Sequence, residues 1–208
     1  MHPDRRFAPS GHDAEPVPAH ISAARMDNAT KVQAIISGDP ARWRLLEVVR
    51  SLRLPDCWIG AGFVRNAVWD CLHGRAPSSL SGDIDVVWFD PGRTNPSEDR
   101  EIEAVLRRLE PSVAWDVKNQ ARMHLRNGDE PYVSATDAIR CFPETATAVA
   151  VRRSEQDHCD IAAPFGLDDL FGLIVRPTPS FSADKRRLYD DRIQAKGWLK
   201  TWPLLRAA

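Results

Sequence analysis

Residues 57–72 read CWIGAGFVRNAVWDCL. The first three residues form a short apolar strand, and the strand runs into the turn Gly60-Ala61-Gly62. Beyond the turn, apolar residues recur at helical spacing and predict a helix with one apolar face, which Gly74 ends. A strand, a glycine turn and a helix in this order bring backbone N–H groups and the positive end of a helix together. That arrangement suits a phosphate group.

Two common phosphate-binding motifs are absent from this turn. Arg65 stands where a G-x-G-x-x-G dinucleotide fingerprint needs its third glycine, and no G-x-x-x-x-G-K motif is present. A purely structural turn therefore remains the alternative interpretation of Gly60-Ala61-Gly62.

A pair of aspartates opens the next predicted strand, Asp83-Ile84-Asp85-Val86-Val87-Trp88-Phe89. Side chains two residues apart leave the same face of a strand, so Asp83 and Asp85 point the same way. Two close carboxylates repel each other unless a cation or a proton lies between them, and Mg²⁺ prefers such oxygen ligands. The pattern favours a shared divalent cation, and a solvated pair at a loop end is the alternative.

A third carboxylate would complete a two-metal site. Asp116 alternates with Trp115 and Val117 on a predicted strand over residues 113–117. Asp160, on a later predicted strand, competes for the same role. Consecutive elements are usually neighbours in space, which favours Asp116.

The remaining pattern predicts an α/β (α+β) fold, a small mixed β-sheet covered by helices. Residues 1–38 are rich in proline and lack sustained periodicity, so we expect a flexible N-terminal tail that folding does not need, followed by one domain over residues 39–208. Further helices are predicted from Asp39-Pro40 to before Pro55, from an N-cap at Ser97 to before Pro111, and over 134–142 and 183–194. Residues 145–151 and 157–162 are expected to pair as a hairpin.

Composition limits the classes of function. The 208 residues carry a net charge of -1, so the chain gives no strong nucleic-acid signal, although a local basic patch is compatible with it. The longest apolar stretch, residues 170–175, is too short to span a bilayer, and we expect no membrane association. No secretory signal is recognisable near the N-terminus, which makes a cytoplasmic location the expectation.

The order of these motifs resembles that of the DNA polymerase β-type nucleotidyltransferase superfamily, and more closely a bacterial nucleotidyltransferase-like family within it. The resemblance covers about residues 40–205 and rests on six segments: residues 60–66 (GAGFVRN), 83–86 (DIDV), 119–124 (NQARMH), 144–148 (ETATA), 163–170 (APFGLDDL) and 196–198 (KGW). The chain departs from the superfamily pattern at the turn, where Gly60-Ala61 or Ala61-Gly62 replaces the usual glycine-serine pair and removes one hydroxyl ligand for phosphate.

The resemblance implies a metal-dependent transfer of a nucleoside monophosphate from a nucleoside triphosphate to an acceptor hydroxyl, with release of pyrophosphate. It implies Mg²⁺ (or Mn²⁺) at Asp83 and Asp85, and triphosphate at Gly60, Ala61 and Gly62, but it supplies no acceptor. Asp116 is the predicted third ligand. Four further side chains near the acids are candidates to neutralise phosphate charge or orient the acceptor: Arg65, Lys118, Arg122 and His124.

Other functions remain as rivals. A catalytically inactive nucleotide-binding or regulatory module on the same fold is favoured if Asp116 does not reach the site, or if the missing serine abolishes triphosphate binding. A phosphatase with an aspartyl nucleophile is disfavoured, because residues 78–82 before Asp83 are not an apolar strand. A two-carboxylate glycosidase would need one acid in an apolar pocket.

Overall fold

The computed structural model describes residues 26–77, 80 and 82–208. A five-stranded mixed sheet in the order β3-β2-β1-β4-β5 forms its centre. β2 and β3 run parallel, whereas β1 pairs antiparallel with both β2 and β4, and β4 with β5. The strands are β1 (Trp58–Gly60), β2 (Asp83–Trp88), β3 (Ala114–Asn119), β4 (Ala150–Arg153) and β5 (Cys159–Ala162). The predicted mixed sheet and the predicted hairpin are both confirmed, although β4 begins later than expected.

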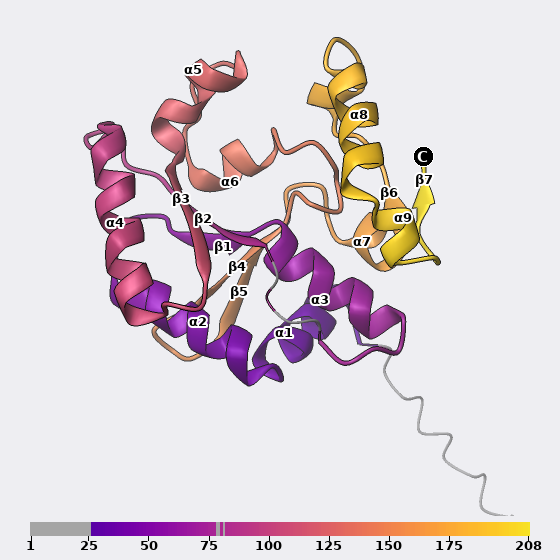
Figure 1. The fold of residues 1–208 in the computed structure, drawn as a ribbon, viewed down its shortest axis with the longest axis horizontal. Coiled ribbons are helices and arrows are strands. Elements are labelled where there is room, and N and C mark those ends of the chain that lie inside the picture. Colours follow the sequence, from indigo (N-terminus) through magenta and orange to yellow (C-terminus); the bar gives the residue numbers. More distant parts are fainter. Residues whose placement is uncertain (1–25, 78–79, 81) are drawn as a thin grey trace, which may run out of the picture.

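Helices lie on both sides of this sheet (Figure 1). In that view α1, α2 and α3 lie below the sheet, α4 flanks β3, and α5, α6 and α8 lie above. The helices are α1 (Asn28–Ser37), α2 (Pro40–Ser51), α3 (Gly62–Leu72), α4 (Pro96–Leu109), α5 (Met123–Asn127), α6 (Ala135–Ile139), α7 (Asp168–Phe171), α8 (Arg186–Lys196) and α9 (Trp198–Thr201). Two short 3₁₀ turns, Gln120–Arg122 and Pro179–Phe181, and a two-stranded sheet of β6 (Ile174–Val175) and β7 (Arg206–Ala207) complete the fold. None of the helices described is long and apolar enough to cross a membrane.

Local sequence signals set the starts of the helices. The carboxylate of Asp39 accepts hydrogen bonds from the amides of Ala41 and Arg42 at 3.0 and 3.1 Å, with Pro40 at the first helical position, as predicted for α2. For α4 the N-cap is Asn95, whose side chain accepts from the amide of Ser97 at 2.9 Å, and the expected cap at Ser97 was wrong. Pro96 takes the first helical position, where its missing N–H costs no hydrogen bond, so the residue before it, Asn95, is the N-cap.

The expected N-terminal tail was wrong for residues 28–37, which form α1. Val32 and Ile36 are fully buried in the main core, and the side-chain amide of Gln33 donates to the carbonyl of Cys159 at 3.1 Å. The apolar stripe of this helix is short, but it packs on elements far along the chain, and tertiary burial stabilises it. The part of the expectation that concerns residues 1–25 lies outside the described residues.

The two faces of the sheet differ in what covers them. Ile84, Val86 and Trp88 face the main core, which they form with apolar side chains of α1–α4. Val87 packs on the opposite face in a smaller cluster that includes Ile139 of α6. Because side chains alternate along a strand, Asp83 and Asp85 lie on the face of Val87, outside the main core.

Candidate functional site

Three aspartates come together on two parallel strands. The register pairs Asp85 of β2 with Asp116 of β3, and neighbouring strands lie about 4.8 Å apart. Asp83 precedes Asp85 by two residues and leaves the same face. The predicted adjacency of these strands is confirmed, so Asp116 lies beside the D-x-D pair; its role as a ligand stays a prediction.

The surroundings of Asp85 disfavour its ionised form. Burial, together with the negative charges of Asp116 and Asp83, raises the pKa of Asp85 to about 6. The positive charges of Arg65 and Arg192 act in the opposite direction. Asp83 is exposed, whereas Asp85 and Asp116 are partly buried. The carboxylates are therefore close enough to repel one another, as expected of a site that lacks its counter-charge.

Lys118 lies next to these acids. Its ammonium group forms an ion pair with Asp116 and lies 3.7 Å from the carboxylate of Glu103 on α4. Glu103 also accepts from the backbone amide of Val117 at 3.2 Å, which covers the open edge of β3. Lys118 thus lies near the acids, as expected, but here its ammonium group neutralises the charge of Asp116.

The glycine turn adjoins Asp85. β1 pairs Trp58 with Val87 and Ile59 with Val86, and continuing this register brings Gly60 opposite Asp85. A Cβ atom at Gly60 would lie 3.4 Å from the methyl group of Ala150 and from the carbonyl oxygen of Val149, so the turn lies in close contact with the start of β4.

Ala61 holds a conformation that favours glycine. Its φ is 53° and its ψ is -119°, and its amide donates to the carbonyl of Val149 at 2.9 Å. α3 follows directly, so the amides of Gly62, Phe63 and Val64 are the free donors of its first turn. These donors, at the positive end of an 11-residue helix, directly follow Gly60 and Ala61, and Gly62 lines the same small hollow as Asp83.

Arg65 lies behind this turn and is buried. Its guanidinium donates to the hydroxyl of Thr147 at 2.9 Å and packs on the ring of Trp198, 4.2 Å from the ring centroid. A side chain at Gly62 would meet Arg65 Nη2 at 3.4 Å, so the guanidinium lies against the turn. Burial lowers the pKa of Arg65 to about 10, and the negative charge of Glu144 opposes this shift. Asp70, further along α3, accepts a hydrogen bond from Trp202 Nε1 at 2.8 Å.

Arg122 and His124 are not brought to the acids. The guanidinium of Arg122 forms an ion pair with Asp99, a buried residue of α4 that also accepts from Trp88 Nε1 at 2.9 Å. The ring of His124 packs edge-on against Tyr132, with ring centroids 6.1 Å apart. Each side chain thus contacts its own neighbours, although Arg122 Nε and His124 Nδ1 are buried without a hydrogen-bond partner among the described residues, and these contacts do not test the expected binding of nucleotide.

Glu144 and Arg192 were missed as site residues. The side chain of Glu144 is fully buried and accepts a hydrogen bond from Arg192 Nε of α8 at 2.7 Å. The positive charge of Arg192 also acts on Asp85. No local signal in the sequence could have joined Arg192 to Asp85, because only the folded chain brings α8 to this end of the sheet.

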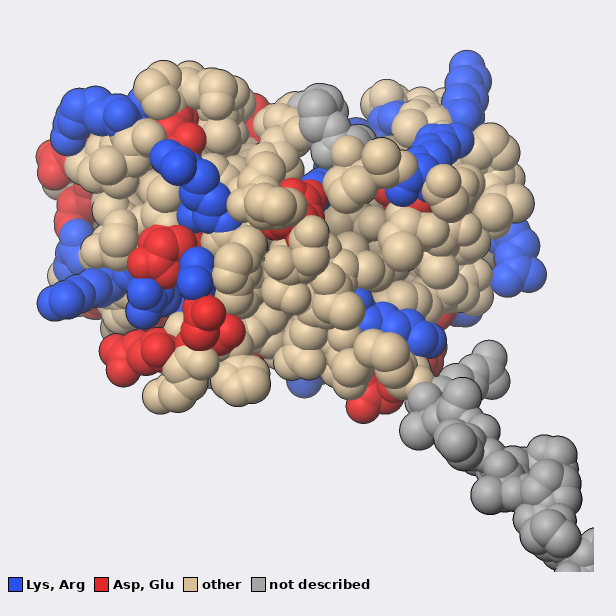
Figure 2. All heavy atoms as spheres, turned by 90° about the horizontal axis from the view of Figure 1, so that it is seen from below, with Lys and Arg blue, Asp and Glu red and all other residues tan. Residues whose placement is uncertain are grey.

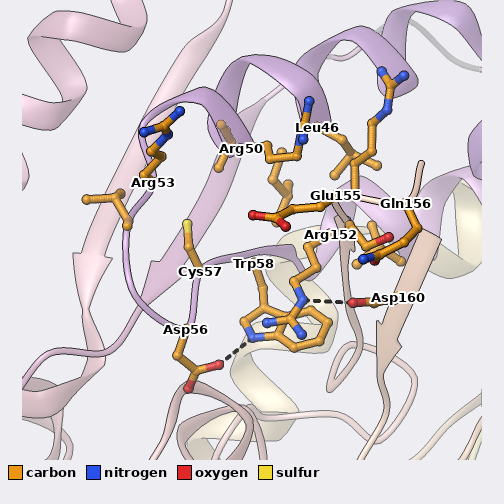
Figure 3. Close-up of a pocket in the computed structure, with 16 residues that line it drawn as sticks. Leu46, Arg50, Arg53, Asp56, Cys57, Trp58, Arg152, Glu155, Gln156 and Asp160 are labelled. Atoms are coloured by element: carbon orange, nitrogen blue, oxygen red, sulfur yellow. Dashed lines mark hydrogen bonds and ion pairs between the residues drawn. The ribbon is translucent and has the colours of Figure 1, made fainter. Parts of the chain in front are cut away.

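Asp160, the rival third acid, lies elsewhere. It forms an ion pair with Arg152 at 3.0 Å, and Arg152 in turn covers the ring of Trp58, as Figure 3 shows. These residues line a pocket of about 890 Å³ at the start of β1, a pocket that none of the three clustered aspartates lines. A far smaller hollow, of about 30 Å³, adjoins Gly62 and Asp83. The acids thus lie outside the pocket that Trp58 and Arg152 line.

The carboxylates do not form a ready-made metal site. Within residues 26–77, 80 and 82–208, no group of three or more His, Cys, Asp and Glu side chains is placed to hold a metal ion. The donor set still fits a hard divalent cation in kind, since three carboxylates share one face and repel one another. Asp116 would have to turn from Lys118 to take part.

Comparison with known proteins agrees with this architecture. Residues 47–207 match the sequence profile of the nucleotidyltransferase family. An NMR structure described as a CCA-adding enzyme head domain is 34% identical, with a TM-score of 0.77 over 86% of this chain and 95% of that chain. A search of curated proteins finds no match.

More distant structures share the fold alone. A CCA-adding enzyme in complex with CTP is 18% identical with a TM-score of 0.52, and covers 85% of this chain. The Thermotoga maritima CCA-adding enzyme complexed with tRNA is 18% identical with a TM-score of 0.53, and covers 86% of this chain. The chain spans only 43% and 42% of the lengths of those two proteins. From the matched sequence profile and the 34% identical head domain, the chain belongs to the nucleotidyltransferase family.

Proposed function

We propose that this protein transfers a nucleoside monophosphate from a nucleoside triphosphate to an acceptor hydroxyl in a divalent-metal-dependent reaction that releases pyrophosphate. One observation carries the proposal. Asp85 and Asp116 lie side by side on parallel strands, and the glycine turn that opens α3 lies opposite Asp85 on the next strand. Carboxylates that would hold a cation and backbone amides that would bind phosphate thus lie at the same end of the sheet.

Asp83, Asp85 and Asp116 would hold Mg²⁺ or Mn²⁺. Bound there, the cation would activate the acceptor hydroxyl and neutralise charge on the leaving pyrophosphate. The raised pKa of Asp85 supports this assignment, because the crowding that raises it is relieved by a counter-charge. If Asp116 held the cation, Lys118 would lose its ion pair with Asp116 and would be free to contact phosphate.

The turn would bind the phosphate groups through backbone amides. The first amides of α3 point out of the helix, and the macrodipole favours a negative charge there. Arg65 supports the turn from behind, so its contribution is positional and electrostatic. The hydroxyl that the superfamily pattern would supply is absent at Ala61, so backbone donors carry more of the phosphate binding.

For the acceptor we propose a nucleic-acid hydroxyl. The 34% identical structure is described as the head domain of a CCA-adding enzyme, and a distant structural neighbour is described in complex with tRNA. The expectation of no strong nucleic-acid partner rested on the net charge of -1. Figure 2 shows one face where basic and acidic side chains are interspersed. We therefore expect RNA binding to depend on shape and hydroxyl contacts, with a weak salt dependence.

A thermal-shift series tests the metal and nucleotide parts of the proposal. The parent protein is melted with ATP, CTP, GTP or UTP, in Mg²⁺, in Mn²⁺ and in EDTA. We expect at least one nucleotide to raise the melting temperature with metal and none to do so in EDTA, because triphosphate and carboxylates repel. Asp85→Asn should abolish the shift. Asp160→Asn, at an acid outside the site, is the matched control and should keep it.

A non-catalytic nucleotide-binding module is the second candidate. Its support is the ion pair of Asp116 with Lys118, together with the lack of a converged metal group among the described residues. Equal stabilisation by nucleotide in EDTA and in Mg²⁺ would favour this module over the transferase.

A further inference from the structure

Glu144 is a fully buried carboxylate with one oxygen in use. It lies in the segment between α6 and β4, where Oε1 accepts from Arg192 Nε at 2.7 Å. Oε2 is buried and has no hydrogen-bond partner within the described part of the chain. An ionised carboxylate is costly to bury unless a cation pairs with it. The buried Glu144 therefore pairs with Arg192, and this ion pair fixes the position of the Arg192 side chain.

Arg192 reaches the turn through a shared aromatic ring. Its Cζ lies 5.4 Å from the ring centroid of Trp198, and the guanidinium of Arg65 packs on the same ring at 4.2 Å. Arg65 in turn lies against Gly62 at the start of α3. Figure 1 shows α8 on the same side of the sheet as α6. Through Arg192, α8 therefore places a second positive side chain, besides Arg65, near the glycine turn.

Arg192 keeps unused donors. The hydrogen bonds of the described residues engage it through Nε alone, and 32% of its side chain is exposed. The edge formed by Nη1 and Nη2 has the planar geometry that matches two oxygens of a phosphate group. The positive charge of Arg192 acts to lower the pKa of Asp85, so the guanidinium lies close enough to the three aspartates to interact with them electrostatically.

We propose that Arg192 binds a phosphate group of the nucleoside triphosphate through Nη1 and Nη2, and that Glu144 is the positioning residue that orients it. The inference rests on the proposed function, because it assumes that triphosphate binds between the acids and the turn. It adds the closing helix to the site. It also gives the buried carboxylate of Glu144 a role.

Binding of two probes tests this inference. The dissociation constants of nucleoside triphosphate and of inorganic pyrophosphate, each with Mg²⁺, are measured by calorimetry for the full-length protein. A charge-assisted contact predicts that Arg192→Gln weakens both by about tenfold to a hundredfold. Arg192→Lys keeps the pair with Glu144 but loses the planar fork, and should weaken both probes by a smaller factor.

Controls separate this contact from a structural role. Because Arg192→Gln leaves Glu144 uncompensated, the double variant Arg192→Gln with Glu144→Gln removes both charges and should melt near the parent. Arg187→Gln, on the exposed face of α8, should bind both probes as the parent does.

Three outcomes would count against the inference. Parental affinity in the folded double variant, or a loss confined to the triphosphate with pyrophosphate unaffected, would overturn it. If the parent itself binds neither probe, the proposed function fails together with the inference.

Discussion

Replacement of Asp85 by asparagine should stabilise the metal-free protein. The pKa of Asp85 rises to about 6 from an ordinary value of 3.8, because burial and the charges of Asp116 and Asp83 disfavour its ionised form. A pKa raised in the folded state means that the folded protein binds this proton more tightly than the unfolded chain. The stability that this group contributes is therefore fully present below its ordinary pKa of 3.8, is lost as the pH rises through about 6, and stays low above that.

The expected size follows from the shift. About two pKa units at about 1.4 kcal/mol each set an upper limit of about 3 kcal/mol, and we expect about 1–2 kcal/mol because asparagine also loses solvation on burial. The measurement is urea denaturation in EDTA at pH 5 and pH 8, with Asp160→Asn as the control. Asp85→Asn should gain more free energy of unfolding at pH 8 than at pH 5. Asp160→Asn loses only a surface ion pair and should change by less than about 1 kcal/mol at both.

If Asp85→Asn instead loses stability, and loses as much at pH 8 as at pH 5, then the ionised carboxylate of Asp85 does not destabilise the metal-free protein. That result would mean that the carboxylate stabilises the fold through its partners, and that the D-x-D pair is structural.

Three further changes test other parts of the structure. Ala61→Gly should raise the free energy of unfolding by about 1 kcal/mol, because the φ of Ala61 is 53° and glycine adopts that conformation without strain. The control Ala67→Gly, inside α3, should lower it by about 1 kcal/mol or more. Both variants are compared in thermal melts, and a destabilised Ala61→Gly would count against backbone strain at this position. Ile36→Ala should lower the free energy of unfolding by about 2–4 kcal/mol in urea titrations, and a neutral result would show that α1 is dispensable. Arg122→Gln should lower it by about 3 kcal/mol, because buried Asp99 loses its cation, yet calorimetry should show parental nucleotide affinity; a selective loss of affinity would return Arg122 to the site.

Local patterns predicted the elements of the site. The strand, turn and helix at residues 57–72 and the D-x-D strand follow from periodicity and turn chemistry, which act between near neighbours. The adjacency of Asp116 to Asp85 needed one further rule, that consecutive elements tend to lie side by side.

Long-range packing supplied what the pattern could not. α1 is a helix because Val32 and Ile36 bury against elements far along the chain, and residues 28–37 alone carry too short a stripe to predict it. Arg192 meets Glu144 only because α8 folds back over the sheet. Arg122 has the charge expected of a phosphate ligand, but its partner Asp99 on α4 is set by the packing of that helix against β3.

A crystal structure with Mn²⁺ and a non-hydrolysable nucleoside triphosphate analogue tests the central claim most directly. We expect an anomalous Mn²⁺ signal between Asp85 and Asp116, with phosphate oxygens at the first amides of α3. Nucleotide bound instead in the pocket beside Trp58 and Arg152, or bound at α3 with no Mn²⁺ at the aspartates, would contradict the central claim.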